Sequence, residues 1–209
     1  DHGGRHGRHF LVPDFGQIRS DNQVLNLSPF EVRFNENRQF FTEGTELFNK
    51  GNLFYSRRIG SNPAFIANVN SKLLPGETIR ENPTESKLLN ATKISGRSGN
   101  GLGVGFFNAV TKRGFARVEN SLGEERLIEA HPLSNYNIMV LDQSLKNNSS
   151  VTFLNTNVIR QGSAYDANVS SFLANLNDRN NKYYVSGAGK FSYVGAEVPG
   201  GSNNSGFNY

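Results

Sequence analysis

Residues 88 to 193 form a series of amphipathic segments, each about ten residues long and separated from the next by a short polar turn. The clearest segments are 101–111, 135–145, 150–161, 164–177 and 182–193. Alternation of apolar and polar side chains predicts β-strands, because successive side chains of a strand point to opposite faces. Strands of roughly 9 to 11 residues also have the length with which a tilted strand crosses a bilayer. The sequence therefore predicts an all-β fold, an antiparallel meander of long strands within the wall of a transmembrane barrel.

The connections between these segments differ on the two sides of the expected sheet. Tight-turn compositions occupy 97–100, 146–149 and 178–181, which would all lie on one side. The long connection at 112–133 lies on the other side, where 115–119 and 126–130 are expected to extend a hairpin beyond the membrane. Short turns on one side and longer loops on the other are typical of outer-membrane barrels.

Composition excludes several other classes of protein. The chain has 28 asparagines and 22 glycines, and both residues disfavour helices and favour turns. It contains no run of 18 apolar residues, which excludes a transmembrane helix. A mean hydropathy of -0.51 is compatible with a barrel, since half of the residues of a barrel wall face a polar lumen.

The net charge of +4 is spread along the chain without a basic tract, so no nucleic-acid partner is expected. The absence of cysteine fits an envelope protein that folds without disulfides.

The chain divides into four parts. Residues 1–12 are a lead rich in His, Arg and Gly, and 13–86 are an irregular region rich in aromatic residues, Arg and Glu. Within that region, 30–34 alternate as a short strand, and the prolines of 61–86 indicate a long loop. Residues 87–193 form the barrel wall, and 194–209 form a tail of Gly, Ser and Asn. The aromatic residues and charges of 30–60 are expected to pack in or against the lumen.

The charges of this irregular region suggest a site. We predict a lumenal ion-pair network in which Arg side chains hold carboxylates and fix a loop inside the barrel. Its expected members are Glu31, Arg33, Glu36, Arg38, Glu43, Arg57 and Arg58. The alternative is glycoside hydrolysis by two carboxylates about 5 to 9 Å apart, chosen from the same group together with Glu46.

The lead offers a second candidate site. His2, His6 and His9, together with Asp1, could bind a transition metal, since imidazole suits Cu, Ni and Zn. The alternative is a polar chain end without a ligand. No cofactor is expected. No catalytic residue is assigned either, because His131 is the one histidine outside the lead and no Ser/His/Asp or Cys/His arrangement can be built.

Seven phrases occur in an order that resembles a known family. They are Pro13-Asp-Phe-Gly-Gln17, Asn26-Leu-Ser-Pro-Phe-Glu31, Glu36-Asn-Arg-Gln-Phe-Phe-Thr-Glu-Gly44, Leu53-Phe-Tyr-Ser-Arg-Arg-Ile-Gly60, Lys93-Ile-Ser-Gly-Arg-Ser-Gly-Asn-Gly-Leu-Gly-Val-Gly105, Asn135-Tyr-Asn and Asp142-Gln-Ser-Leu-Lys-Asn-Asn-Ser149. Over residues 13–193 the chain resembles outer-membrane proteins of Bacteroidota whose defining domain is of unknown function. Members of that family carry a carbohydrate-binding-like β-sandwich before a C-terminal barrel.

This resemblance implies a location in the outer membrane of a Gram-negative bacterium, with membrane lipid as partner. Glycans or other envelope proteins are further partners that it suggests. The chain lacks the sandwich, and six strands are too few to close a barrel, so we expect a fragment of a longer protein. The leading hypothesis is a non-enzymatic barrel segment that serves transport across, or surface interaction at, the outer membrane. The rivals are a glycan-binding or glycan-processing envelope protein and a soluble secreted β-sandwich with a structural role.

Overall fold

The computed structural model describes residues 36, 38–56, 59, 68–83, 85–162, 164–195 and 204–208. Short helical elements precede the strands: α1 Gln39–Thr42, η1 Lys50–Asn52 and η3 Val69–Lys72. The strands are β1 Thr78–Glu81, β2 Leu88–Arg97, β3 Leu102–Thr111, β4 Gly114–Glu119, β5 Glu125–His131, β6 Ser134–Ser144, β7 Ser150–Arg160, β8 Ala167–Asn177, β9 Tyr184–Val194 and β10 Asn204–Asn208. No helix in this described part of the chain is long and apolar enough to cross a membrane.

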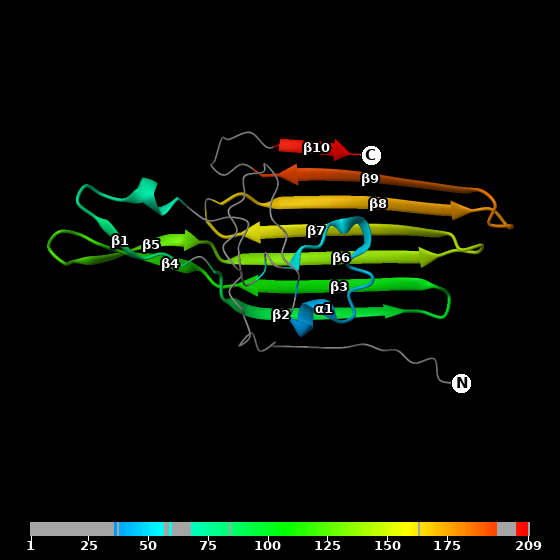
Figure 1. Ribbon diagram of the computed structural model, residues 1–209, viewed down its shortest axis with the longest axis horizontal. Helices are drawn as coiled ribbons and strands as arrows, with labels where there is room; N and C mark the ends of the chain where they lie inside the picture. The colour runs from blue at the N-terminus through cyan, green and yellow to red at the C-terminus, as the bar shows by residue number, and fades with distance from the viewer. Residues whose placement is uncertain are drawn as a thin grey trace.

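Seven of the strands form one antiparallel sheet in the order β10-β9-β8-β7-β6-β3-β2 (Figure 1). The expected meander is confirmed, since each long strand pairs with the next long strand along the chain. The five expected segments begin and end within three residues of β3, β6, β7, β8 and β9. The sheet is open as far as the structure describes it, because its two edges, β2 and β10, do not pair with each other.

The turns between the long strands have the expected chemistry. Asn147 and Asn148 link β6 to β7 with φ values of 59° and 54°, and Asn181 lies between β8 and β9 with a φ of 51°. Asparagine tolerates this left-handed conformation better than other residues that carry a Cβ. The abundance of asparagine, which argued against helices, is thus partly explained by the tight turns at one end of the sheet.

The long connection between β3 and β6 forms the β4–β5 hairpin, which pairs with the earlier strand β1 in a smaller sheet. The strands of this sheet lie in the order β1-β4-β5 and project beyond the end of the large sheet (Figure 1). The hairpin expected at 115–119 and 126–130 is confirmed as β4 and β5. The loop expected over 61–86 differs, because it contains η3 and β1, and β1 pairs with β4. The tail expected over 194–209 likewise contains β10, which pairs with the edge of β9.

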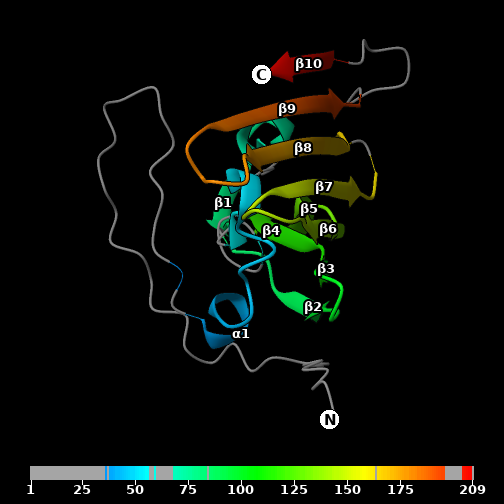
Figure 2. The same cartoon turned by 90° about the vertical axis from the view of Figure 1, so that its right-hand side faces the viewer.

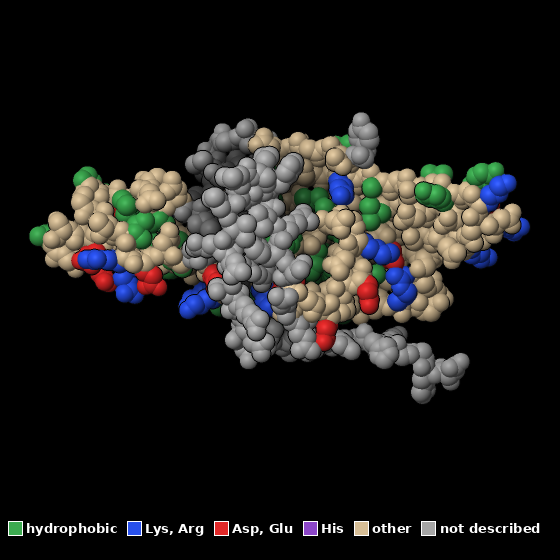
Figure 3. All heavy atoms as spheres, in the orientation of Figure 1, with side chains coloured by type: hydrophobic (Ala, Val, Ile, Leu, Met, Phe, Trp, Pro, Cys, Tyr) green, Lys and Arg blue, Asp and Glu red, His purple; other side chains and the backbone are tan. Residues whose placement is uncertain are grey.

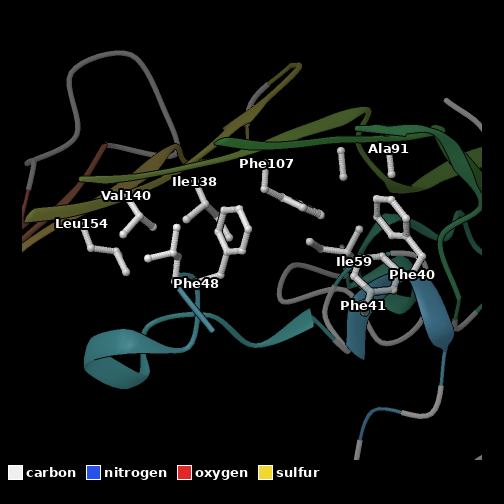
Figure 4. Packing of buried hydrophobic residues seen from close by; sticks show 11 residues of the cluster. Phe40, Phe41, Phe48, Ile59, Ala91, Phe107, Ile138, Val140 and Leu154 are labelled. Carbon is white, nitrogen blue, oxygen red and sulfur yellow. The ribbon is translucent and has the colours of Figure 1, made fainter. Parts of the chain in front are cut away.

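One face of the large sheet is covered by the segment 38–56, which we call the strap. Figure 2, a view toward one end of the long strands, shows α1 and the start of the strap on one side of the sheet. Phe40, Phe41 and Phe48 of the strap are buried with Phe107 and Leu154 of the sheet (Figure 4). The ring of Phe107 lies 5.4 Å from that of Phe54 and 6.0 Å from that of Phe41, centroid to centroid. The principal hydrophobic core therefore lies between the large sheet and an irregular segment, and not between two sheets.

Two glycines of β3 make room for the strap. A Cβ on Gly105 would lie 3.1 Å from the ring of Phe48, and one on Gly103 would lie 3.0 Å from Leu47. Side chains larger than hydrogen at these positions would force the strap outward. The alternation of glycine with Leu102, Val104 and Phe106 in the sequence therefore has a physical cause. The glycine face of β3 is the covered one, and its apolar face is the uncovered one.

Candidate functional site

The two faces of the large sheet are the features that most constrain its function. Residues directly opposite each other on neighbouring strands share a face. The pairs Val104–Leu141, Leu141–Phe153 and Phe153–Phe172 therefore place one row of apolar side chains across β3, β6, β7 and β8. We call the face that carries this row the bare face and the opposite face, under the strap, the covered face.

The bare face exposes its large apolar side chains. The exposed fraction is 44% for Val104, 55% for Phe172 and 71% for Val185. Other exposed members include Ile94, Leu102, Phe106, Met139, Leu141, Phe153 and Phe191. They come from six adjacent strands and form a continuous surface, which is far more extensive than the scattered apolar residues of ordinary protein surfaces. On β3 and β6, burial of the alternate positions shows that this exposure belongs to one face.

The covered face carries a buried carboxylate with several partners. Asp142 of β6 is 1% exposed and receives a hydrogen bond of 2.6 Å from the hydroxyl of Thr152. Lys50 of η1 forms an ion pair of 2.5 Å with Asp142 Oδ1, and Arg97 of β2 pairs with the other carboxylate oxygen. The contact between Lys50 and Asp142 holds the strap to the sheet across 92 residues of sequence.

Gly103 makes the second of these ion pairs possible. It lies between Arg97 and Asp142 in the register of the sheet, on the intervening strand β3. A Cβ on Gly103 would lie 3.1 Å from Nη2 of Arg97. The guanidinium therefore reaches Asp142 across a position without a side chain.

A buried cation fixes the other end of the strap. Lys93 of β2 is 5% exposed, and its ammonium group donates to the carbonyl oxygens of Phe40 and Glu43. It also lies 4.9 Å from the centre of the Phe40 ring. Carbonyls at the end of a helix carry partial negative charge, so a cation there is favourable. Lys93 thus ties α1 to β2, as Lys50 ties η1 to β6.

Glu36 and Arg38 of the expected network do meet. Arg38 binds Glu36 through two nitrogens, at 2.9 and 2.7 Å, and donates to the carbonyl oxygens of Ser56 and Ile59. Ser56 donates a 2.6 Å hydrogen bond to Glu36. Burial raises the pKa of Glu36, but the hydrogen bonds from Arg38 and Ser56 outweigh it, so the pKa lies below its usual value. This direction is the opposite of what a general acid in glycoside hydrolysis needs.

The remaining expected site residues divide into two groups. Glu43 lies in the strap, and its backbone carbonyl accepts from Lys93. Glu31, Arg33, Arg57 and Arg58 lie outside the described residues, as do His2, His6 and His9. Among the residues that the structure does describe, no cluster of His, Cys, Asp or Glu could hold a metal ion. The full network and the metal site therefore remain predictions.

Sequence reasoning missed the contacts of Lys50, Lys93, Arg97 and Asp142. A local signal exists for two of them: Lys93 follows Ala91 and Asp142 follows Val140 on the covered face of their strands. A charge at such a position marks a face that is not a plain hydrophobic core. The partners themselves could not be read locally, because they depend on the register of the sheet and on where the strap crosses it.

The fold and this site define an all-β protein with an open antiparallel sheet, one face of which is strapped by ion pairs and the other bare and apolar. Residues 9–209 match the family described as Domain of unknown function (DUF5916), and the chain belongs to that family. No curated protein and no solved structure matches the chain.

Proposed function

We propose that the large sheet is part of the wall of an outer-membrane β-barrel, in which the bare face meets lipid and the strap lies in the lumen. The observation that carries this proposal is the exposure of the bare face across β2 to β9. Exposing so many Phe, Leu, Ile and Val side chains to water would be costly, at roughly 25 cal/mol for each Å² of apolar surface. Contact of these side chains with the hydrocarbon of a lipid bilayer removes that cost without a protein partner.

The polarity of the covered face supports the same arrangement. Lys93, Asp142, Thr152, Arg160 and Ser171 all lie buried there, each on a long strand. A barrel lumen is the polar side of its wall, and charges within it pair with one another or with loops that enter it. In this proposal the strap is such a lumenal segment, and the strands β2, β3 and β6 to β9, of 10 or 11 residues, have the length of tilted membrane strands.

The function that we assign to this wall is non-enzymatic: passage of a solute across the outer membrane, or interaction at its surface. The strap, held by Lys50 and Lys93, would partly fill the lumen and restrict what can pass. The β1–β4–β5 sheet would project from the membrane as an extended loop. The charged side chains of this sheet lie close together at its end of the molecule (Figure 3), which suits an aqueous surface.

The test uses a pair of adjacent residues on opposite faces of β8. Residues 1–209 contain no tryptophan, so Phe172→Trp and Leu173→Trp each introduce a single reporter once any tryptophan elsewhere in the full-length protein is replaced by phenylalanine. In vesicles of brominated phosphatidylcholine, the full-length protein should show strong quenching of the indole at position 172 and little quenching of the indole at position 173, because bromine on acyl chains quenches by contact. A change of gel migration on heating would accompany a closed barrel. Equal lack of quenching in both variants, with a monodisperse monomer in detergent-free buffer, would refute the proposal.

A further inference from the structure

A ladder of asparagine side chains crosses the bare face. It consists of Asn108 on β3, Asn137 on β6, Asn155 and Asn157 on β7, and Asn168 on β8. Asn108 donates to Asn137 at 2.8 Å, and Asn137 donates to Asn157 at 2.9 Å. Asn155 donates to Asn168 at 3.1 Å and to the hydroxyl of Ser170 at 2.8 Å. We call this set the amide ladder.

The amide ladder divides the bare face into two zones. Between the ladder and the tight turns lie the apolar rows, including Val104, Leu141 and Phe153. Beyond the ladder, toward the β1–β4–β5 sheet, the next register row contains Asn90, Val110, Asn135 and Ile159. Asn108, Asn137, Asn157 and Asn168 thus share one register row on four adjacent strands, and polar residues are frequent from there onward.

Hydrogen bonds within the ladder do not satisfy all of its polar atoms. An asparagine amide offers two N–H donors and an oxygen with two acceptor sites. Among the described residues, Oδ1 of Asn108 accepts no hydrogen bond and Nδ2 of Asn157 donates none. An amide without partners is strongly unfavourable in pure hydrocarbon, whereas water or polar headgroups provide the missing partners. The polarity of the ladder therefore complements the headgroup layer of a bilayer.

The position of the ladder fits the same boundary. From Asn137 to Leu145 at the turn, β6 advances eight residues, about 26 Å along a strand at about 3.3 Å per residue. Tilting the strand by about 40° leaves about 20 Å across the membrane. The bacterial outer membrane is thinner than the average membrane, and a bilayer tolerates small mismatches between its thickness and that of the protein.

The boundary also steps across the sheet. On β7 and β8 the first polar residues, Asn155 and Ser170, lie one register row nearer the turns than Asn137 does on β6. In a barrel with tilted strands, each strand is displaced along its neighbour. A line at constant depth in the membrane therefore crosses neighbouring strands at different register rows.

We infer that the hydrocarbon layer ends at the amide ladder, where the asparagine side chains hydrogen-bond to lipid headgroups and their water. This inference rests on the proposed wall function and adds its depth and orientation. Its consequence is specific: Ile159 is apolar and 51% exposed, yet it lies on the aqueous side of the boundary. The β1–β4–β5 sheet lies on that side too, and the tight turns lie at the opposite membrane surface.

The experiment compares two apolar, exposed residues of the same strand and face. Residues 1–209 contain no cysteine, so Phe153→Cys and Ile159→Cys each allow attachment of one environment-sensitive fluorophore without altering the ladder, once any cysteine elsewhere in the full-length protein is replaced by serine. The labelled full-length protein is placed in phosphatidylcholine vesicles that carry a nitroxide either on the acyl chain or on the headgroup. The label at 153 should be quenched more by the acyl-chain nitroxide. The label at 159 should be quenched more by the headgroup nitroxide. The ratio of acyl-chain quenching to headgroup quenching should therefore be above one at position 153 and below one at position 159.

The possible failures are distinguishable. If neither nitroxide quenches the label at 153, the wall function itself is wrong. If the acyl-chain nitroxide dominates at both positions, the wall function stands and the inferred boundary is overturned. Val110→Cys on β3 lies in the same register row as Ile159 and provides a second position in case Ile159→Cys does not fold. An inverted ratio at either of these positions supports the boundary.

Discussion

The two sheets of this chain distribute their apolar and charged side chains differently. The small β1–β4–β5 sheet buries Ala116, Val118 and Ile128 and places ion pairs such as Arg80–Glu119 at its surface. The large sheet exposes Phe153 and Phe172 on one face and buries Lys93 and Asp142 on the other. Both sheets consist of antiparallel strands, so the difference in their exposed side chains indicates that they suit different surroundings. The small sheet suits water, and the bare face of the large sheet suits an apolar medium.

The largest effect should come from a charge placed on the bare face. Phe153→Arg would put a cation among Leu141, Phe172 and their neighbours, at a cost of about 2–4 kcal/mol near the middle of a bilayer. The matched control, Leu127→Arg, lies on the exposed side of the small sheet and should change stability by less than about 0.5 kcal/mol. Urea unfolding of both variants in vesicles measures the difference. Equal stability of the two variants would remove the contrast between the sheets.

A smaller effect is expected at the buried carboxylate of the covered face. Asp142→Asn removes the charge that Lys50 and Arg97 share and should cost about 2–3 kcal/mol, because both cations stay close together without a counter-ion. The strap should then become more accessible to protease while the sheet keeps its strands. Digestion near Lys50, followed by mass spectrometry, tests this. Unchanged protection of the strap would show that the hydrophobic contacts of Phe48 and Phe107 hold it alone.

Gly103 offers an independent route to the same site. Gly103→Val would obstruct Arg97 and Leu47, whereas Gly187→Val on β9 has no atom within 4 Å of the added Cβ. Overpacking costs about 1–3 kcal/mol, so the first variant should loosen the strap and the second should not. Similar behaviour of the two variants would argue against a role for Gly103 in the Arg97–Asp142 pair.

The smallest effect concerns the response of two ion pairs of the small sheet to acid. A hydrogen bond from Arg126 lowers the pKa of Glu77, and one from Arg80 lowers the pKa of Glu119. Carboxyls with a lower pKa in the folded state contribute stability above their unfolded pKa, near 4.3, and lose it as pH falls through the folded pKa. Exposed pairs contribute little and are screened by salt. The Tm should therefore fall slightly more between pH 6 and pH 3 for the parent than for a Glu77→Gln, Glu119→Gln double variant, by calorimetry at low salt. An equal fall in both proteins would leave these pairs without a role.

The sequence by itself determined the strands, the turns and the meander, because side-chain alternation and turn chemistry are local properties of the chain. It also indicated that Leu102, Val104 and Phe106 share one face. Only the tertiary structure decided which face is covered, since that depends on the strap crossing Gly103 and Gly105 from 50 or more residues away in sequence. Asn155 and Asn157 disturb the alternation of β7 when it is read alone, and become a ladder only when the register places them beside Asn168 and Asn137. Pairing of side chains across strands is not a property of any one segment, and the contacts of Asp142 and the amide ladder arise only when the strands assemble.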